Sequence, residues 1–158
     1  MPAQPLLQHV LWRFGFGPEV NSWPEWQRLP QKDWWPTLKK KSLETPLVHF
    51  DVADSAIKGL LMGLGETSQL DRKDLDKNEK KVIREKSKDN LKTLNALWVD
   101  EMVQSPAQLR EKMAFFWHGH FASRNFNILY QQQLLEIVRT HALGNFKTLL
   151  TAVSKSAA

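Results

Sequence analysis

The sequence contains no cysteine, and this absence removes several kinds of chemistry at once. Disulfide bonds, thiolate metal sites and a cysteine nucleophile are all excluded. No serine lies in a Gly-x-Ser-x-Gly turn, and there is no glycine-rich loop of the kind that cradles phosphate groups. The usual sequence signs of nucleophilic catalysis and of nucleotide binding are therefore missing.

Long apolar runs are also missing. Nowhere in the 158 residues is there a run of about 18 apolar residues, the length that a bilayer span requires. The first twelve residues lack a basic leader, and Gln8 and His9 interrupt their apolar stretch, so they make a poor signal peptide. If the chain begins at its natural start, we expect a cytoplasmic protein without a membrane span.

Runs of one charge sign are scarce: apart from Lys39, Lys40 and Lys41 the basic residues are spread out, although the chain has a formal net charge of +5. Residues 71–92 hold nine Lys/Arg and six Asp/Glu, which largely neutralise one another. Interspersed charges are typical of a solvated helix surface rather than of a groove that follows phosphates. The pattern does not favour nucleic-acid binding.

Apolar residues recur at helical spacing through most of the chain, and no segment alternates apolar and polar residues over the length of a strand. The sequence therefore predicts an all-α fold, an irregular bundle of about six to seven helices with a long charged helix in the middle, as a single domain over residues 1–158. The candidate segments for these helices are residues 5–14, a short stretch after Ser22, a stretch from Asp33 that keeps Pro36 in its first turn, residues 54–62, a long segment from 71 or 78 to 104, residues 105–120, residues 128–143, and a last stretch capped by Asn145.

The clearest local signal is "SPAQ", which predicts a helix start. Ser105 is the expected N-cap, Pro106 the first helical residue, and Gln108, three positions after the serine, completes a capping box. The helix that it opens carries the segment "FFWHGHF" in its last turns.

Two histidines of that segment, His118 and His120, are candidate metal ligands together with His141. Residues two apart on a helix point in nearly opposite directions, so both could hold one ion only if the helix broke at Gly119. Three imidazoles would form an open site for zinc or another divalent metal. This interpretation predicts a metal-dependent, hydrolase-like domain.

The alternative interpretation is that "FFWHGHF" ends a core helix without a metal. Its helical spacing then predicts that Phe116 and His120 point inward, while His118 lies at the surface beside Glu111. A histidine near a helix C-terminus is favourable by about 0.3–1 kcal/mol when protonated. This interpretation is the stronger one, because no carboxylate has convincing ligand spacing.

Seven tryptophans are many for this length, and four of them (residues 23, 26, 34 and 35) fall within 13 residues. Such density could form a sugar-stacking platform, and with the basic residues 39–41 it suggests a carbohydrate- or polyanion-binding module. A local core under loop-rich structure is the more common reason for such a cluster. Trp98 and Trp117 lie on or beside apolar helical stripes, so we expect both to be substantially buried.

Three segments together resemble a bacterial family of uncharacterised proteins, the domain of unknown function 1800. The segments are "LWRFGFGP" near the start, "LREKMAFFWHGHFAS" in the middle and "RTHALGNFKTLLTAVSKSAA" at the end. The residues that match the motifs of the family are Arg13, Gly15, Phe16, Gly17, Phe116, Trp117, His118, His120, Phe121, Arg139, His141, Ala142, Leu143 and Gly144.

The resemblance also implies what this sequence does not include. Family members are longer and continue with a segment similar to Asn-Glu-Asn-Phe-Ala-Arg-Glu, which does not occur before Ala158. We therefore expect an N-terminal fragment, a structural or interaction module of a larger protein. Its last helix should expose apolar residues that self-associate or contact the missing C-terminal segment. The resemblance names no reaction, so an enzymatic activity is neither predicted nor excluded.

Overall fold

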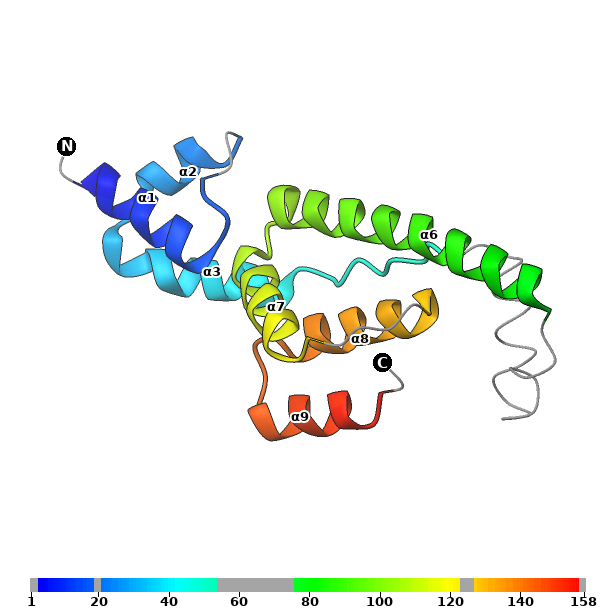
Figure 1. The fold of residues 1–158 in the computed structure, drawn as a ribbon. Coiled ribbons are helices and arrows are strands. Elements are labelled where there is room, and N and C mark those ends of the chain that lie inside the picture. Colours follow the sequence, from blue (N-terminus) through cyan, green and yellow to red (C-terminus); the bar gives the residue numbers. More distant parts are fainter. Residues whose placement is uncertain (1–2, 19–20, 54–75, 123–126, 157–158) are drawn as a thin grey trace.

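The computed structural model of the chain describes residues 3–18, 21–53, 76–122 and 127–156 (Figure 1). Within these ranges every regular element is a helix, so the predicted all-α fold is confirmed there. The helices are α1 (Ala3–Phe14), α2 (Trp23–Arg28), α3 (Gln31–Glu44), α6 (Lys77–Gln104), α7 (Gln108–His120), α8 (Ile128–His141) and α9 (Phe146–Ser154). The helix expected at residues 54–62 lies outside the described residues. None of the described helices is both long and apolar enough to cross a membrane.

Several helix ends lie where the sequence predicts them. The long helix α6 ends at Gln104, and α8 begins at Ile128. Asn145 caps α9, because its side-chain oxygen accepts a hydrogen bond of 2.8 Å from the Lys147 backbone N–H. Asparagine side chains thus cap the starts of both α8 and α9, at Asn127 and Asn145.

The start of α7 corrects the prediction from "SPAQ". The helix begins at Gln108 with Ala107 at the N-cap, so Ser105 is not the cap and there is no capping box. The Ser105 hydroxyl instead accepts from the Ala107 N–H at 3.2 Å, within the turn. The Gln108 side chain donates to the carbonyls of Ser105 and Met102, and thereby ties the turn to the end of α6.

The start of α3 also differs from the expectation. The helix begins at Gln31, two residues before Asp33, so Pro36 lies inside the helix rather than in its first turn. A proline there removes one backbone hydrogen bond, and burial of Trp34 and Leu38 in the same helix holds it in place.

The first three helices enclose a small core of their own, which we call the N-terminal core. It consists of Leu7, Leu11, Trp26, Trp34, Leu38 and, from α7, Leu109. The Trp34 indole donates to the Leu29 carbonyl at 3.0 Å. Lys41 pairs with Glu25 and lies over the Trp26 ring, 5.3 Å from its centroid. The tryptophan-rich segment is thus mainly a local core, although Trp35 remains exposed.

The second and larger core, the main core, lies between α6, α7, α8 and α9. The expected burial of Trp98 is confirmed, and Leu94 and Met102 of α6 are buried in the same core. An extended segment, residues 45–53, follows α3 and runs between α6 and α8 (Figure 1). Helix α7 contacts both groups of helices and therefore joins the two cores.

The turn after α1 is fitted against the start of α7. The Phe16 N–H donates to the Gln108 side chain at 2.9 Å. A Cβ atom on Gly15 would lie 3.0 Å from the Cβ of Gln108, and Gly17 has a φ of 110°, which favours glycine. The two glycines allow this close approach.

Candidate functional site

The most buried charges of the described chain form one cluster, the arginine–glutamate cluster, where α6, α7 and α8 meet. Glu111 is 0% and Arg139 1% exposed. The Arg139 guanidinium donates to both carboxylate oxygens of Glu111, from Nε at 2.8 Å and from Nη2 at 3.0 Å. Trp98 and Arg110 donate to the same carboxylate, at 3.1 Å and 3.2 Å. Glu111 is therefore fully paired inside the protein.

The charges of the cluster balance. Glu101 on α6 supplies a second carboxylate, with its Oε1 at 3.4 Å from Arg139 Nη2. Two arginines thus face two glutamates. Removing charges from water costs several kcal/mol each unless they are paired and hydrogen-bonded, and this cluster meets both conditions.

The remaining guanidinium nitrogens hold the extended segment 45–53. Arg110 donates to the carbonyls of Thr45 and Pro46, at 2.6 Å and 3.3 Å, and Arg139 donates to the carbonyl of Val48. Together with the bonds to Glu111, these contacts use every nitrogen of both guanidinium groups. The cluster therefore fastens the extended segment to α7 and α8, which is a structural task.

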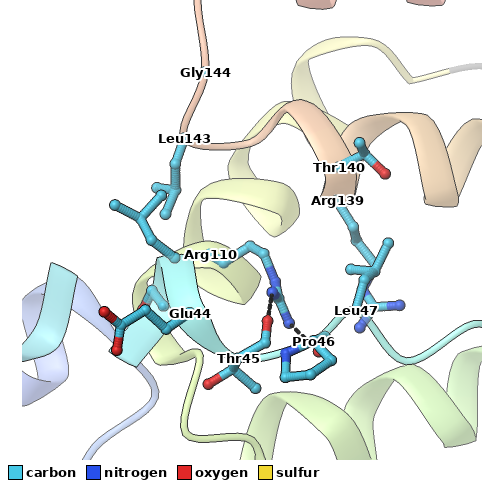
Figure 2. A pocket seen from close by; sticks show the side chains of 11 residues that line it. Glu44, Thr45, Pro46, Leu47, Arg110, Arg139, Thr140, Leu143 and Gly144 are labelled. Carbon is cyan, nitrogen blue, oxygen red and sulfur yellow. Dashed lines mark hydrogen bonds between the residues drawn. The ribbon is translucent and has the colours of Figure 1, made fainter. Parts of the chain in front are cut away.

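A shallow groove of about 460 Å³ lies over this cluster (Figure 2). It runs from the end of α3 to the end of α8, and its lining includes Thr45, Arg110, Thr140 and Gly144. Figure 2 shows the Arg110 guanidinium directed at the Thr45 and Pro46 carbonyls. Because the guanidinium is occupied by these acceptors, the groove does not present it to an anionic ligand.

The sequence analysis missed this cluster, and its placement of Glu111 beside a surface histidine was wrong. Glu111 lies in the interior and its partner is Arg139, 28 positions further on. One sequence feature could have predicted the burial of Glu111: its spacing places it on the same helix face as Ala114, which is buried.

The three candidate histidines do not gather into one site. Gly119 does not break α7, which continues to His120, so His118 and His120 lie on different sides of the helix. His118 meets the Trp98 ring edge-on at 5.2 Å, whereas His120 meets the Trp117 ring at 5.9 Å. His141 is the last residue of α8 and its carbonyl accepts from Gly144. In the described part of the chain no three His, Asp or Glu side chains are placed to hold a metal ion.

Burial against Trp98 gives His118 a lowered pKa. The imidazole is part-buried in apolar surroundings, and desolvation disfavours its charged form. His118 is therefore not the surface residue that the spacing predicted.

The last turns of α7 and the start of α9 bring together a group of exposed and half-buried rings that we call the aromatic surface. It consists of Phe116, Trp117, His120, Phe121 and Phe146. Trp117 is its centre, with ring centroids at 4.9 Å to Phe116 and 5.5 Å to Phe146. Its indole is part-buried and donates to the Ala142 carbonyl at 3.2 Å.

The expectation that Phe116 and His120 point inward was wrong. Phe116 is 57% exposed, and His120 is exposed as well. They share a helix face with Leu109 and Met113, but only those two pack against the N-terminal core. The face continues beyond the helices that cover it, so its last two positions reach solvent.

The family of the chain follows from its sequence. A family model described as "Protein of unknown function (DUF1800)" matches residues 9–158. The chain belongs to this family. No curated protein and no solved structure shows a significant match to the chain.

The segments that carry the resemblance to the DUF1800 family meet around α7. The glycine turn after α1 contacts Gln108 at the start of this helix. The segment with His118 and His120 forms its end and most of the aromatic surface. The third segment supplies Arg139 to the buried cluster and the Ala142 carbonyl to Trp117. In this DUF1800 member the motifs thus describe a packing arrangement, and membership in the family brings no reaction with it.

Proposed function

We propose that the chain is a structural and interaction module that binds a partner polypeptide through the aromatic surface. The observation that carries this proposal is the exposure of large apolar side chains in one place. Phe116 and Phe146 are 57% and 50% exposed, and both touch the Trp117 ring. Leu150, one turn after Phe146 on α9, is 45% exposed and extends the surface.

Covering these apolar side chains with a partner would be energetically favourable. Fully burying a Phe or Leu side chain contributes about 1.5–3 kcal/mol relative to leaving it exposed. Burial of the exposed parts of three such side chains against a partner would therefore contribute a few kcal/mol, on the order of 2–4, to the free energy of binding. Exposed apolar groups that are gathered rather than scattered mark interaction sites.

The polar groups support the same conclusion. The arginines and glutamates with a buried position are paired with one another and with backbone carbonyls, so they serve the fold. The histidines contact aromatic rings and are not assembled as metal ligands in the described ranges. This placement of the histidines gives no support to the metal-dependent alternative. The carbohydrate-binding alternative gains no support either, because Trp26 and Trp34 are buried and cannot stack on a sugar.

A selection from a random peptide library displayed on phage tests the proposal. We expect enriched peptides that bind the wild-type chain and lose binding to the double variant Phe116→Ser/Phe146→Ser. The matched control is Trp12→Ser/Trp35→Ser, which removes two exposed aromatic side chains elsewhere and should leave peptide binding unchanged.

Two outcomes would contradict the proposal. One is that no peptide is enriched, and the other is that the double variant binds the enriched peptides as well as the wild type does. Sedimentation of both proteins over a range of concentrations separates a second copy from a foreign partner. Self-association that the double variant abolishes would assign the surface to a homo-oligomer.

A further inference from the structure

The segments that form the aromatic surface carry charge of almost one sign. Between Lys112 and the last residue, Ala158, the sequence has a single acidic residue, Glu136. Its carboxylate lies on α8, at 2.9 Å from the His49 imidazole. Arg139 adds no free charge, because Glu111 neutralises it in the interior. Among the described residues of this stretch, lysines therefore supply the free charge near the exposed rings.

Two lysines border the aromatic surface. Lys147 follows Phe146 directly and precedes Leu150 by three positions, so it lies on the exposed side of α9 next to both. Lys112 precedes Phe116 by one turn of α7, and its ammonium lies 4.8 Å from the Phe16 ring centroid. The first turn of α9 has no acidic residue, so the partial positive charge of that helix end adds to the two lysines.

The apolar part of the surface has the spacing that a helix recognises. Phe116 and His120 are four residues apart on α7, and Phe146 and Leu150 are four residues apart on α9. The two rows meet where the Trp117 and Phe146 rings touch. Rows of side chains four apart form ridges on a helix surface, and a third helix can pack its own side chains into the groove between two such ridges.

From these observations we infer that the partner is an acidic amphipathic helix, which lays apolar side chains on the two rows and carboxylates beside Lys112 and Lys147. This inference rests on the proposed function. A polypeptide helix supplies anchors at positions i, i+3, i+4 and i+7, and charge complementarity selects an acidic one. A second copy of the chain fits less well, because it carries a net charge of +5 and would bring the same lysines to the contact.

The test uses the whole chain and three synthetic helical peptides of about 15 residues. All three have the same apolar positions, and their polar positions are mainly Glu, Gln or Lys. Fluorescence anisotropy should show that the Glu peptide binds at least about tenfold more tightly than the Gln peptide, and that the Lys peptide binds most weakly. Raising the salt concentration from about 0.05 M to about 0.5 M should remove most of this difference.

A charge reversal on α9 locates the effect. Lys147→Glu should lower the affinity for the Glu peptide about tenfold and raise the affinity for the Lys peptide about tenfold. The matched control is Lys155→Glu, which makes the same charge change at the C-terminal end of α9 and should alter either affinity less than about twofold. Circular dichroism verifies the helical content of both variants, and Lys147→Gln serves as a milder replacement.

The outcomes separate the two proposals. Equal binding of the Glu and Gln peptides, with both lost in Phe116→Ser/Phe146→Ser, would overturn the acidic partner and leave the proposed function standing. If none of the three peptides binds, the inference fails, whereas the phage selection decides the proposed function separately. Binding to vesicles of anionic phospholipid in place of any peptide would assign the surface to a membrane and overturn the inference.

Discussion

The two halves of α7 reverse the usual relation between polarity and burial. Its first turns bury Arg110 and Glu111, whereas its last turns expose Phe115 and Phe116. Both halves belong to one regular helix, so the difference does not come from local conformation. It comes from what surrounds each half.

The first half lies among α3, α6 and α8, which supply Arg139, Trp98 and the carbonyls after α3 as partners for its charges. In the second half, the rings of Phe116, Trp117 and His120 contact one another, and the Trp117 ring also contacts Phe146 on α9. A charged residue can thus be interior where the fold provides partners, and an aromatic residue can be exposed where it provides no cover.

The largest expected effect comes from breaking the charged half. In Glu111→Gln the carboxylate is lost and two buried guanidinium groups keep their charge without full compensation. We expect the free energy of unfolding to fall by about 3–5 kcal/mol, measured by urea denaturation. Glu25→Gln is the control, since it removes the exposed carboxylate that pairs with Lys41 and should cost less than about 1 kcal/mol. Similar midpoints for the two variants would contradict the structural role of the cluster.

A smaller loss is expected from Trp98→Phe, which keeps an aromatic ring in the main core. The substitution removes the indole N–H that donates to Glu111, so we expect a cost of about 1–3 kcal/mol. Phe116→Leu, which also shortens an aromatic side chain but at the exposed half, should change stability by less than about 0.5 kcal/mol. Thermal denaturation measures the loss of stability in both variants. A larger loss in Phe116→Leu than in Trp98→Phe would contradict the comparison of the two halves.

The exposed half depends on α9 for the Phe146 ring, and α9 depends on its cap. Asn145→Ala removes the acceptor for the Lys147 N–H and should cost about 1 kcal/mol in a denaturant titration. Asn145→Asp retains an acceptor at the same position and should restore most of that stability. Equal losses in the two variants would show that the cap does not stabilise α9.

The smallest effect concerns His118, which belongs to the last turn of α7 but is part-buried against Trp98. Burial lowers its pKa in the folded protein below the ordinary value of 6.5. Between these two values the unfolded chain binds a proton that the folded chain does not. Stability therefore falls as the pH drops through 6.5, and this contribution stops changing below the folded pKa.

Comparing the wild type with His118→Gln in thermal denaturation between about pH 8 and about pH 5 isolates this contribution, because glutamine does not titrate. The variant should lose less stability on acidification than the wild type does. Parallel pH profiles would show that His118 is not the group responsible.

The sequence by itself determined which segments are helical and where many of them end. Apolar spacing predicts α1 and the buried stripe of α6 at Leu94 and Trp98, and Asn145 predicts the start of α9. These features depend on residues within a few turns of one another, and their physics is local. The start of α7 was misplaced because Gln108 bonds to Phe16, 92 positions away, in addition to the end of α6.

Only the tertiary structure decided which parts of a helix face are covered. Periodicity placed Leu109 and Phe116 on the same face of α7, but the N-terminal core covers only the first of them. Likewise, no spacing along the chain shows that Glu111 is neutralised by Arg139, since that pair forms when α8 packs against α7. Burial and ion pairing depend on neighbours from distant segments, and those neighbours exist only once the chain is folded.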